Sequence, residues 1–408
     1  MSTYDYIIIG GGIAGLYARY LLSNYKVLLL EKEKYLGGRG IEINFHNEQI
    51  KLGAGIAAPH NKHLLKLLNK LKIKYQKVKG DINIAFETEF NINKSIDLII
   101  KKYNSLKKEN HVDIKNLNVK EFIIKYFGKE FFREYSSLAE YTDFFDSDLE
   151  YYIKYYPILD HKISKYSIIY LSWQDLIDQL KIKGKGEIKL DLEVKNIIKL
   201  DKDFIVNNKF RTKNIIFTVT INSLNKIIEK TKLFNQKPYS YIDYIPFIRI
   251  YTYHKNGHKL DNKKTIDNKI IQRYNIVDNH LQKIIIISDK ILMISYSDNE
   301  HANYWYKYSS DKNTLIKKIL KILEIMFGED QLKDFKIDDI FIKYWKEGIH
   351  YYKPHPMIKF DDLLNKLQNP IDNIYVGGEM VSKKQGWVEG SIENIDTIYK
   401  IVNYNKNS

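Results

Sequence analysis

The pattern of apolar and polar positions at the start of the chain predicts a strand, a helix and a second strand. Residues 6–9 are a continuous apolar run, which is typical of a strand buried on both faces. Residues 13–22 carry apolar side chains at helical spacing, and residues 26–30 form a second apolar run. These elements in this order indicate a βαβ unit, the building block of an α/β protein with a parallel sheet.

The middle of the chain predicts two further kinds of segment. Residues 79–167 are expected to be mostly helical, because apolar residues recur at helical spacing in residues 89–104 and 121–132. Residues 236–339 mix extended apolar runs with helical spacing. In this part we expect strands at residues 245–254, 282–288 and 290–297 and a helix at residues 313–328.

Three glycines at the first strand–helix junction form a G-x-G-x-x-G motif. Gly10 permits a tight turn, Gly12 lets a phosphate approach the backbone, and Gly15 lets the helix pack closely on the strand. The helix would begin at Ile13 and Ala14, where free backbone N–H groups and the positive end of the helix dipole favour a pyrophosphate. The motif therefore predicts a dinucleotide site.

An acidic residue completes this motif at the end of the second apolar run. Glu31 follows Gly10 by 21 residues, the spacing at which a carboxylate contacts a ribose hydroxyl. A carboxylate at this position would repel the extra phosphate of NADP. The motif alone leaves both NAD and FAD open.

Two further glycine segments favour the longer cofactor. Residues 37–39 read Gly-Gly-Arg, in which Gly38 allows close approach and Arg39 can pair with a phosphate. Residues 51–59 read KLGAGIAAP, with two glycines around one alanine after an extended segment. Such a backbone can lie flat against a planar ring. The candidate ring contacts in this segment are Gly53, Ala54, Gly55 and Ile56.

The last part of the chain carries a strand, a glycine turn and a helix. Gly378 and Glu379 follow the apolar run, and the helix is expected to begin near Val388. Trp387 stands just before that helix, between two glycines at positions 386 and 390. Glycines cost helix stability, so their presence at a helix start indicates a functional demand.

The order of these motifs resembles the flavin-containing amine oxidase family, which includes monoamine and polyamine oxidases. The resemblance implies a noncovalent FAD, with Glu31 on the adenosine ribose and the backbone of Val194 on the adenine. It further implies that Arg39 and Glu379 lie along the phosphates and the ribityl chain. The N–H of Val388 would face the flavin N1–O2 edge, where the helix dipole stabilises negative charge.

The same resemblance implies hydride transfer from the carbon beside an amine nitrogen to the flavin, with two aromatic walls around the amine. Trp387 matches one wall by position, and Tyr351 is preferred over Tyr352 for the other. Where many members place a lysine near flavin N5, this chain has Arg249. Arginine does not deprotonate at working pH, but it can position water or bind a carboxylate.

An acidic stretch at residues 139–156 allows two interpretations. Its carboxylates could attract a polyamine to the mouth of a site. The preferred interpretation is structural, because Ser147 and Glu150 have the spacing of a capping box at the start of an amphipathic helix.

Composition excludes several other chemistries. The 408 residues include no cysteine, which excludes disulfides, thiolate metal sites and cysteine-linked flavin. His60 and His63 have no further cluster of ligands beside them, so we predict no metal. The net charge of +15 comes from scattered lysines rather than from a basic block, so no nucleic-acid partner is expected. No apolar run reaches the roughly 18 residues of a membrane helix.

These observations predict an α/β protein with a Rossmann-like FAD-binding domain and a mixed α+β substrate domain inserted in two pieces. We expect a cytoplasmic monomer or homodimer without a membrane partner, which oxidises a small-molecule amine to an imine and reduces O₂ to hydrogen peroxide. Alternatives are an FAD-dependent desaturase or isomerase acting on an apolar substrate and a redox-silent FAD-binding protein. The FAD-binding domain is predicted at residues 1–78, 168–235 and 340–408, and the substrate domain at residues 79–167 and 236–339.

Overall fold

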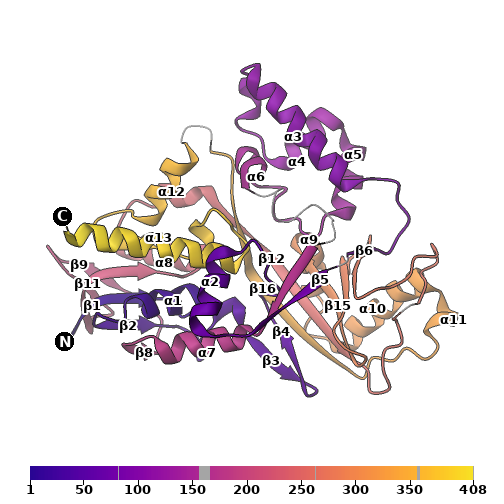
Figure 1. Ribbon diagram of the computed structural model, residues 1–408, viewed down its shortest axis with the longest axis horizontal. Coiled ribbons are helices and arrows are strands. Elements are labelled where there is room, and N and C mark those ends of the chain that lie inside the picture. Colours follow the sequence, from indigo (N-terminus) through magenta and orange to yellow (C-terminus); the bar gives the residue numbers. More distant parts are fainter. Residues whose placement is uncertain (81, 156–165, 262, 356–358, 408) are drawn as a thin grey trace.

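The computed structural model describes residues 1–80, 82–155, 166–261, 263–355 and 359–407, and two large β-sheets organise it (Figure 1). The first sheet has the strand order β8-β2-β1-β11-β10-β9, and β17 also pairs with β11. Strands β8, β2, β1, β11 and β17 are parallel, whereas β10 and β9 are antiparallel additions. The strands are β1 (Ser2–Ile9), β2 (Val27–Leu30), β8 (Glu187–Lys189), β9 (Ile197–Lys199), β10 (Phe204–Val206), β11 (Phe210–Phe217) and β17 (Ile374–Val376).

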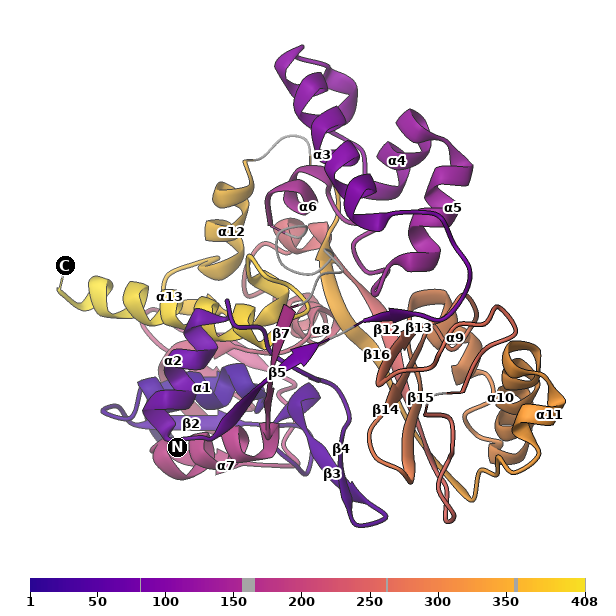
Figure 2. The ribbon, with the colours of Figure 1, turned by 45° about the vertical axis from the view of Figure 1, so that its right-hand side comes forward.

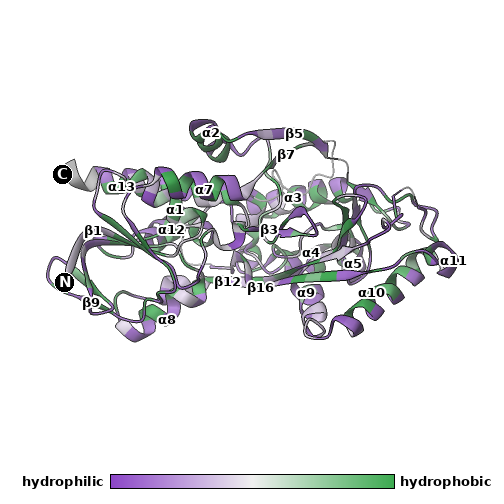
Figure 3. Ribbon diagram, turned by 90° about the horizontal axis from the view of Figure 1, so that it is seen from below, coloured by the Kyte–Doolittle hydropathy of each residue, from purple (hydrophilic) through white to green (hydrophobic). Residues whose placement is uncertain are grey.

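Helices cover both faces of the first sheet, as a parallel sheet requires. Successive side chains of a strand point to opposite faces, so Ile7 and Ile9 join one core cluster while Tyr6 and Ile8 join another. The helices carry both apolar and polar residues along their length (Figure 3), as helices between a sheet and solvent do. They are α1 (Ile13–Leu21), α2 (Lys62–Leu71), α7 (Trp173–Lys183) and α13 (Val388–Asn407) on one face and α8 (Ile221–Thr231) and α12 (Phe360–Gln368) on the other.

The second sheet has the strand order β16-β12-β15-β14-β13-β6 and lies beside the first (Figure 2). The three long strands β12, β15 and β16 are antiparallel to their neighbours. The strands are β6 (Asn83–Ile84), β12 (Ile242–Tyr253), β13 (Tyr274–Ile276), β14 (Lys283–Ile286), β15 (Ile291–Asp298) and β16 (Asp339–Tyr352). Helices α9 (Asn299–Tyr306), α10 (Lys312–Phe327) and α11 (Glu329–Leu332) follow β15 in the chain.

The alternation of side chains in β12 gives the second sheet two different faces. Ile248 and Ile250 belong to the core cluster that α10 completes. Phe247, Arg249 and Tyr251 point the other way and line a cavity between the two sheets. The strand thus brings a charged residue to the cavity while its neighbours build a core.

A helical module stands above the junction of the sheets (Figure 1). Its four helices confirm the helical periodicity of this part of the sequence, whose residues 156–165 lie outside the described residues. Helix α6 begins after Asp148, whose carboxylate accepts the Tyr151 N–H at 2.8 Å. The capping box that the sequence predicted at Ser147 is therefore wrong, since the Ser147 hydroxyl donates to the Phe144 carbonyl instead. The module comprises α3 (Ile92–Lys108), α4 (Val119–Phe127), α5 (Lys129–Leu138) and α6 (Leu149–Tyr155).

Two small antiparallel pairs complete the fold. The hairpin of β3 and β4 packs against the second sheet through Phe45 and Ile50, which join Tyr251 and Met293 in one cluster. The pair of β5 and β7 connects the first sheet to the helical module. These strands are β3 (Glu42–Phe45), β4 (Glu48–Lys51), β5 (Tyr75–Gly80) and β7 (Tyr166–Leu171).

The division of the chain into two domains stays a prediction. Strand β16 was assigned to the cofactor domain by its position in the sequence, but it lies in the second sheet beside β12.

Short 3₁₀ turns occur at Gly38–Gly40, Val112–Ile114, Lys237–Tyr241 and Glu379–Val381. Among the described residues, none of the helices has both the length and the apolar composition that crossing a bilayer requires.

Helix α10 offers a matched pair of substitutions that tests the core of the second sheet. Ile319 is fully buried in the cluster, whereas Ile325 in the same helix is 63% exposed. We expect Ile319→Ala to lower the free energy of unfolding by about 2–5 kcal/mol, because it leaves a cavity. Ile325→Ala should change it by less than about 0.5 kcal/mol. Urea unfolding of both variants measures this, and equal losses would contradict the packing described.

Candidate active site

One large cavity, of about 1100 Å³, runs from the carboxyl ends of the first sheet to the inner face of the second. Its volume exceeds the roughly 300–1000 Å³ that a single small ligand occupies in most proteins. Open parallel sheets bind ligands outside the carboxyl ends of their strands, so one end of the cavity lies where a nucleotide is expected. The other end lies under β12, β15 and β16.

The glycine motif shapes the first end of this cavity. Gly10 has φ of 110°, a conformation that glycine adopts readily, and Gly12 lines open space that a Cβ would enter without contact. Helix α1 begins at Ile13 without a side-chain cap, and Ile13 and Ala14 line the cavity. The N–H groups of the first turn are therefore free for an anion. Gly15 lies outside the lining, and its Cβ would come within 1.9 Å of the Gly10 carbonyl oxygen.

The acid at the end of β2 also lies in the cavity wall. The carboxylate of Glu31 accepts the Gly11 N–H at 2.5 Å and the Glu33 N–H at 2.8 Å. The carbonyl of Glu31 accepts the Leu192 N–H at 2.9 Å, which brings the segment containing Val194 to the same end. Val194 lines the cavity from a segment without regular secondary structure.

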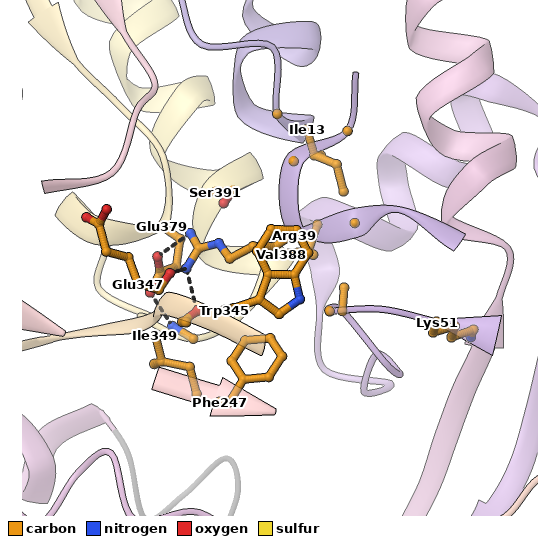
Figure 4. Close-up of a pocket in the computed structure, with 18 of the residues that line it drawn as sticks. Ile13, Arg39, Lys51, Phe247, Trp345, Glu347, Ile349, Glu379, Val388 and Ser391 are labelled. Atoms are coloured by element: carbon orange, nitrogen blue, oxygen red, sulfur yellow. Dashed lines mark hydrogen bonds and ion pairs between the residues drawn. The ribbon is translucent and has the colours of Figure 1, made fainter. Parts of the chain in front are cut away.

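A buried ionic network joins four parts of the chain at the centre of the cavity (Figure 4). Glu379 accepts hydrogen bonds from Arg39 at 2.8 Å, from the His350 ring at 2.7 Å and from the Gly386 N–H at 2.8 Å. Arg39 also donates to the carbonyl of Gly348 in β16. Burial opposes the charge on Glu379, but Arg39 and His350 outweigh it and hold the pKa of this carboxyl well below its usual range.

The backbone after β4 is fixed by side chains from several elements. The carbonyl of Lys51 accepts from Arg249 at 2.8 Å and from the Tyr251 hydroxyl at 2.6 Å. The Leu52 carbonyl accepts from the Trp345 indole at 2.7 Å. The Gly55 carbonyl accepts from the Lys51 ammonium at 2.8 Å and from the indole of Trp173, the first residue of α7.

Glycine is required in this segment because neighbours leave no room for a side chain. A Cβ on Gly53 would come within 2.0 Å of the Arg39 carbonyl oxygen, and one on Gly55 within 3.0 Å of Arg249 Nη2. Ala54 donates its N–H to the same Arg39 carbonyl at 2.8 Å. Gly53, Ala54, Gly55 and Ile56 all line the cavity.

Aromatic residues line the second end of the cavity. Figure 4 shows the rings of Phe247 and Trp345 beside each other, near Arg39. Tyr296 lies against Arg249, with the guanidinium carbon 4.4 Å from the centre of its ring. The further aromatic lining residues in this part are Tyr141, Tyr170, Tyr251 and Tyr274.

Most of the predicted site residues lie together in this cavity. The predicted residues that line it are Gly10, Gly12, Ile13, Ala14, Glu31, Gly38, Arg39, Gly53, Ala54, Gly55, Ile56, Val194, Arg249, Gly378, Glu379, Trp387 and Val388. Gly15 and Tyr351 are outside the lining. Gly15 nevertheless has the close helix packing that the motif predicts.

Tyr351 was predicted as one aromatic wall, but the structure places it outside the lining of this cavity. Trp345 and Ile349 of β16 line the cavity, but the strand runs past its edge before Tyr351, which lies opposite Asp243 of β12. Tyr352, the other candidate, is fully buried and its hydroxyl donates to the Ser382 carbonyl at 3.0 Å. The position near the network is therefore aliphatic, at Ile349.

Several lining residues were missed in the sequence because their own segments carry no motif. Lys51 is buried beside the 53–55 segment, and burial lowers its pKa to about 8. Phe247 and Tyr296 reach the cavity only through the pairing of β12 with β15. The alternation in residues 245–254 could have identified Phe247 as a partner of Arg249 on one face.

One group of possible metal ligands does form in the structure. His63, Glu389 and Glu393 place one ligand atom each within 4.8 Å of one another. The Lys384 ammonium lies 3.5 Å from Glu389 and 3.0 Å from Glu393, and it supplies the positive charge there. Glu389 also accepts the Leu64 N–H at the start of α2, so the group acts as a helix cap.

Comparisons with known proteins agree with this arrangement. A family model described as an NAD(P)-binding Rossmann-like domain matches residues 8–71. An uncharacterized protein of Acanthamoeba polyphaga mimivirus is 25% identical over 120 residues, which are 26% of this chain and 23% of that protein. Flavin-containing amine oxidase A of Bos taurus is 35% identical over 80 residues, 19% of this chain and 15% of that enzyme. The chain thus spans less than a quarter of the curated relatives it matches.

Solved structures match over nearly the whole chain. Cyclohexylamine oxidase from Brevibacterium oxydans has a TM-score of 0.75 at 13% identity, with 98% of this chain and 99% of that chain covered. Wild-type putrescine oxidase bound to putrescine has a TM-score of 0.71 at 13% identity, with the same coverage. The chain has an α/β fold with a Rossmann-like domain, and this fold is shared with amine oxidases. The resemblance of its motifs to the flavin-containing amine oxidases is thereby confirmed.

Substitutions at two glycines of the motif distinguish an effect on folding from an effect on ligand binding. Gly12→Ala adds a methyl group in open cavity space, so we expect the free energy of unfolding without cofactor to change by less than about 0.5 kcal/mol. Its affinity for FAD should nevertheless fall, because the methyl group occupies the expected phosphate position. Gly15→Ala collides with the backbone and should destabilise the protein with or without FAD. Urea unfolding and fluorescence titration with FAD measure both; wild-type FAD affinity in Gly12→Ala would exclude the assigned phosphate site.

The buried network predicts a particular dependence of stability on acid. Because the pKa of Glu379 is lowered in the folded protein, its ionised form stabilises the fold above the ordinary carboxyl pKa of about 4.3, and this contribution is lost as pH falls below it. Glu379→Gln should be less stable at pH 7 but lose less stability between about pH 5 and pH 3. Urea unfolding at several pH values measures the slopes, and parallel curves would refute the assignment.

Proposed function

We propose that the protein is an FAD-dependent oxidoreductase of the amine oxidase type, which oxidises an amine to an imine and passes the electrons to O₂. The observation that carries this proposal is the continuous cavity. One end of it, at the first sheet, is the nucleotide cradle around Gly10, Gly12 and Glu31. The other end, under the second sheet, is the aromatic chamber around Phe247, Tyr296 and Trp345. The glycine segments at residues 37–39 and 53–55 lie between these two ends.

The residues of the cradle fit a flavin dinucleotide. The uncapped start of α1 beside Gly12 suits a pyrophosphate, and the buried carboxylate of Glu31 suits a ribose. A side chain at position 12 would fit without collision, but it would occupy the open space that a phosphate needs. The segment at residues 53–55 lines the path onward to the aromatic chamber, where the ring system would lie.

A flavin held by these residues would supply the acceptor for a hydride, with its two electrons, from the carbon beside the amine nitrogen. The C–H bond breaks, the nitrogen loses a proton, and a C=N double bond forms. Dioxygen then takes up two electrons and two protons to give hydrogen peroxide. Water hydrolyses the imine after its release.

The chain's own residues would prepare the amine for this step. The amine must be neutral to lose a hydride, and burial among the rings of Phe247, Trp345 and Trp387 disfavours the ammonium form. The same rings restrict the orientation of the substrate. Trp387 stands at the start of α13 beside Val388, so it lies next to the helix end that would face the cofactor.

The start of α13 has a second role in this proposal. Val388 and Ser391 of the first turn line the cavity, where the N–H groups of a helix start face outward. Positive potential at this position stabilises negative charge that develops when a flavin is reduced. Glu379 fixes this region because it accepts the Gly386 N–H.

The first test is anaerobic reduction of the bound cofactor. We expect protein purified with excess FAD to be yellow and its flavin absorbance to bleach with at least one class in a panel of amines. Admission of air should restore the absorbance and produce one hydrogen peroxide for each amine oxidised. A flavin that dithionite reduces but no amine reduces would exclude the oxidase, in favour of the desaturase or redox-silent alternatives.

Substitutions at Trp387 and Tyr351 provide a matched comparison of the aromatic wall. Trp387→Leu should slow flavin reduction about tenfold or more, because the substrate loses its orientation. Tyr351→Leu should leave the rate within about twofold, since this ring lies outside the cavity. Stopped-flow absorbance measures both rates, and the reverse order would contradict the structural placement.

A further inference from the structure

A buried arginine without a carboxylate partner is the feature of the aromatic chamber that the proposed amine chemistry does not use. Arg249 is 1% exposed and lines the cavity from the centre of β12. Its guanidinium donates to the Lys51 carbonyl, forms hydrogen bonds with the hydroxyls of Tyr251 and Tyr296, and lies against the ring of Tyr296. Among the residues that the structure describes, no ion pair joins it to a carboxylate, and its buried Nε has no hydrogen-bond partner.

Such an arrangement is costly unless a ligand completes it. A guanidinium remains charged at all working pH values and has five N–H donors. A buried charge normally pairs with an opposite charge, because removal from water is expensive. Carboxylates match the planar fork of arginine with two parallel hydrogen bonds.

Two further basic side chains, Lys51 and Lys283, lie near Arg249. Burial lowers the pKa of Lys51 and of Lys283 to about 8, and Arg249 lowers both further in the same direction. Arg273 also lines the cavity. A diamine or polyamine would bring a second cation into this chamber, where it would be repelled.

The acidic residues nearby are already engaged with other groups. Asp298 accepts the Thr142 N–H and hydroxyl, each at 2.8 Å, and Glu140 accepts the Tyr274 hydroxyl at 2.9 Å. Asp143 lines the cavity and acts electrostatically on Lys283. Glu42 accepts the Trp173 N–H at 2.9 Å. These carboxylates therefore do not form an ion pair with Arg249, and its positive charge remains at the wall of the chamber.

The position of Arg249 relates this cation to the proposed chemistry. Its Nη2 atom lies 3.0 Å from where a Cβ of Gly55 would stand, in the segment that we expect beside the flavin ring. A group held by Arg249 would thus lie next to the reacting carbon rather than at a distant mouth. An α-amino acid has its carboxylate on that same carbon.

We propose that the substrate is an amine with a carboxylate on or near the carbon that is oxidised, an amino acid, and that Arg249 binds this carboxylate. This inference rests on the proposed oxidase function. The product would be an imino acid, which water converts to a 2-oxo acid and ammonia. The electron balance is that of the amine reaction, with hydride to the cofactor and O₂ as final acceptor.

Matched substrates test the proposal on the FAD-loaded protein. The pairs are phenethylamine with phenylalanine, tyramine with tyrosine and putrescine with ornithine, with both enantiomers of each amino acid. In anaerobic titrations the amino acid of a pair should reduce the flavin with at least about a tenfold lower half-saturating concentration than the amine. Equal or better reduction by the plain amines would overturn the proposal while it leaves the oxidase function intact.

Charge-removing variants locate the effect. Arg249→Gln should weaken the response to amino acids by about 100-fold and leave the amines within about threefold, with partial recovery in Arg249→Lys. Lys343→Gln is the matched control, because Lys343 lies opposite Arg249 in β16 but outside the cavity lining. It should behave as wild type. Loss of FAD affinity in Arg249→Gln without loss of amino-acid preference would assign Arg249 to the cofactor and overturn the proposal.

A binding measurement separates the two proposals. Benzoate has a carboxylate but no amino group, so it can bind without being oxidised. Its binding should perturb the flavin absorbance, and Arg249→Gln should lower its affinity at least about tenfold. Benzoate binding that depends on Arg249 in a protein that no amine or amino acid reduces would uphold the carboxylate site and refute the oxidase. Absence of such binding in wild type would refute the carboxylate site.

Discussion

The short backbone segment after β4 holds the two sheets together, and the cavity depends on it. Buried carbonyl groups require hydrogen-bond donors. Those of residues 51, 52 and 55 obtain them from side chains on β12, on β16 and at the start of α7. Because these donors come from the second sheet and from a helix that covers the first sheet, the segment links the two ends of the cavity. The same contacts explain why glycine occurs twice within three residues.

The electrostatics of the cavity differ between its centre and its far end. At the centre, Glu379 is matched by Arg39 and His350, and the charges are nearly balanced within one buried network. Under the second sheet, Arg249 and Lys51 contact carbonyl oxygens, tyrosine hydroxyls and aromatic rings, and within the described part of the chain neither forms an ion pair with a carboxylate. A matched network rigidifies the fold by itself, whereas a buried cation that has neutral acceptors but no carboxylate partner can still pair with an anion.

The cavity lining at the first sheet could be predicted from the sequence because its signals are local. Gly10, Gly12 and Glu31 act within a single strand–helix–strand unit, so their spacing alone places them. The cavity lining under the second sheet depends on register between distant strands. β12 carries a bulge between Ile245 and Phe247 opposite β16, and the end of the cavity along β16 falls between Ile349 and Tyr351. The spacing of residues within one segment reveals neither the bulge nor the end of the cavity. For this reason the sequence analysis placed Tyr351 in the cavity wall and missed Lys51.

The order of strands in the first sheet has a consequence for how the protein is made. β1 lies near the start of the chain and pairs with β11. On its other side β11 pairs with β17, which is formed by residues 374–376. The cavity also needs Trp387 and Val388. A ribosome releases the chain from its N-terminus, so the nucleotide cradle emerges long before the wall that closes it. A chain that ended before residue 374 would therefore lack both β17 and this wall of the cavity.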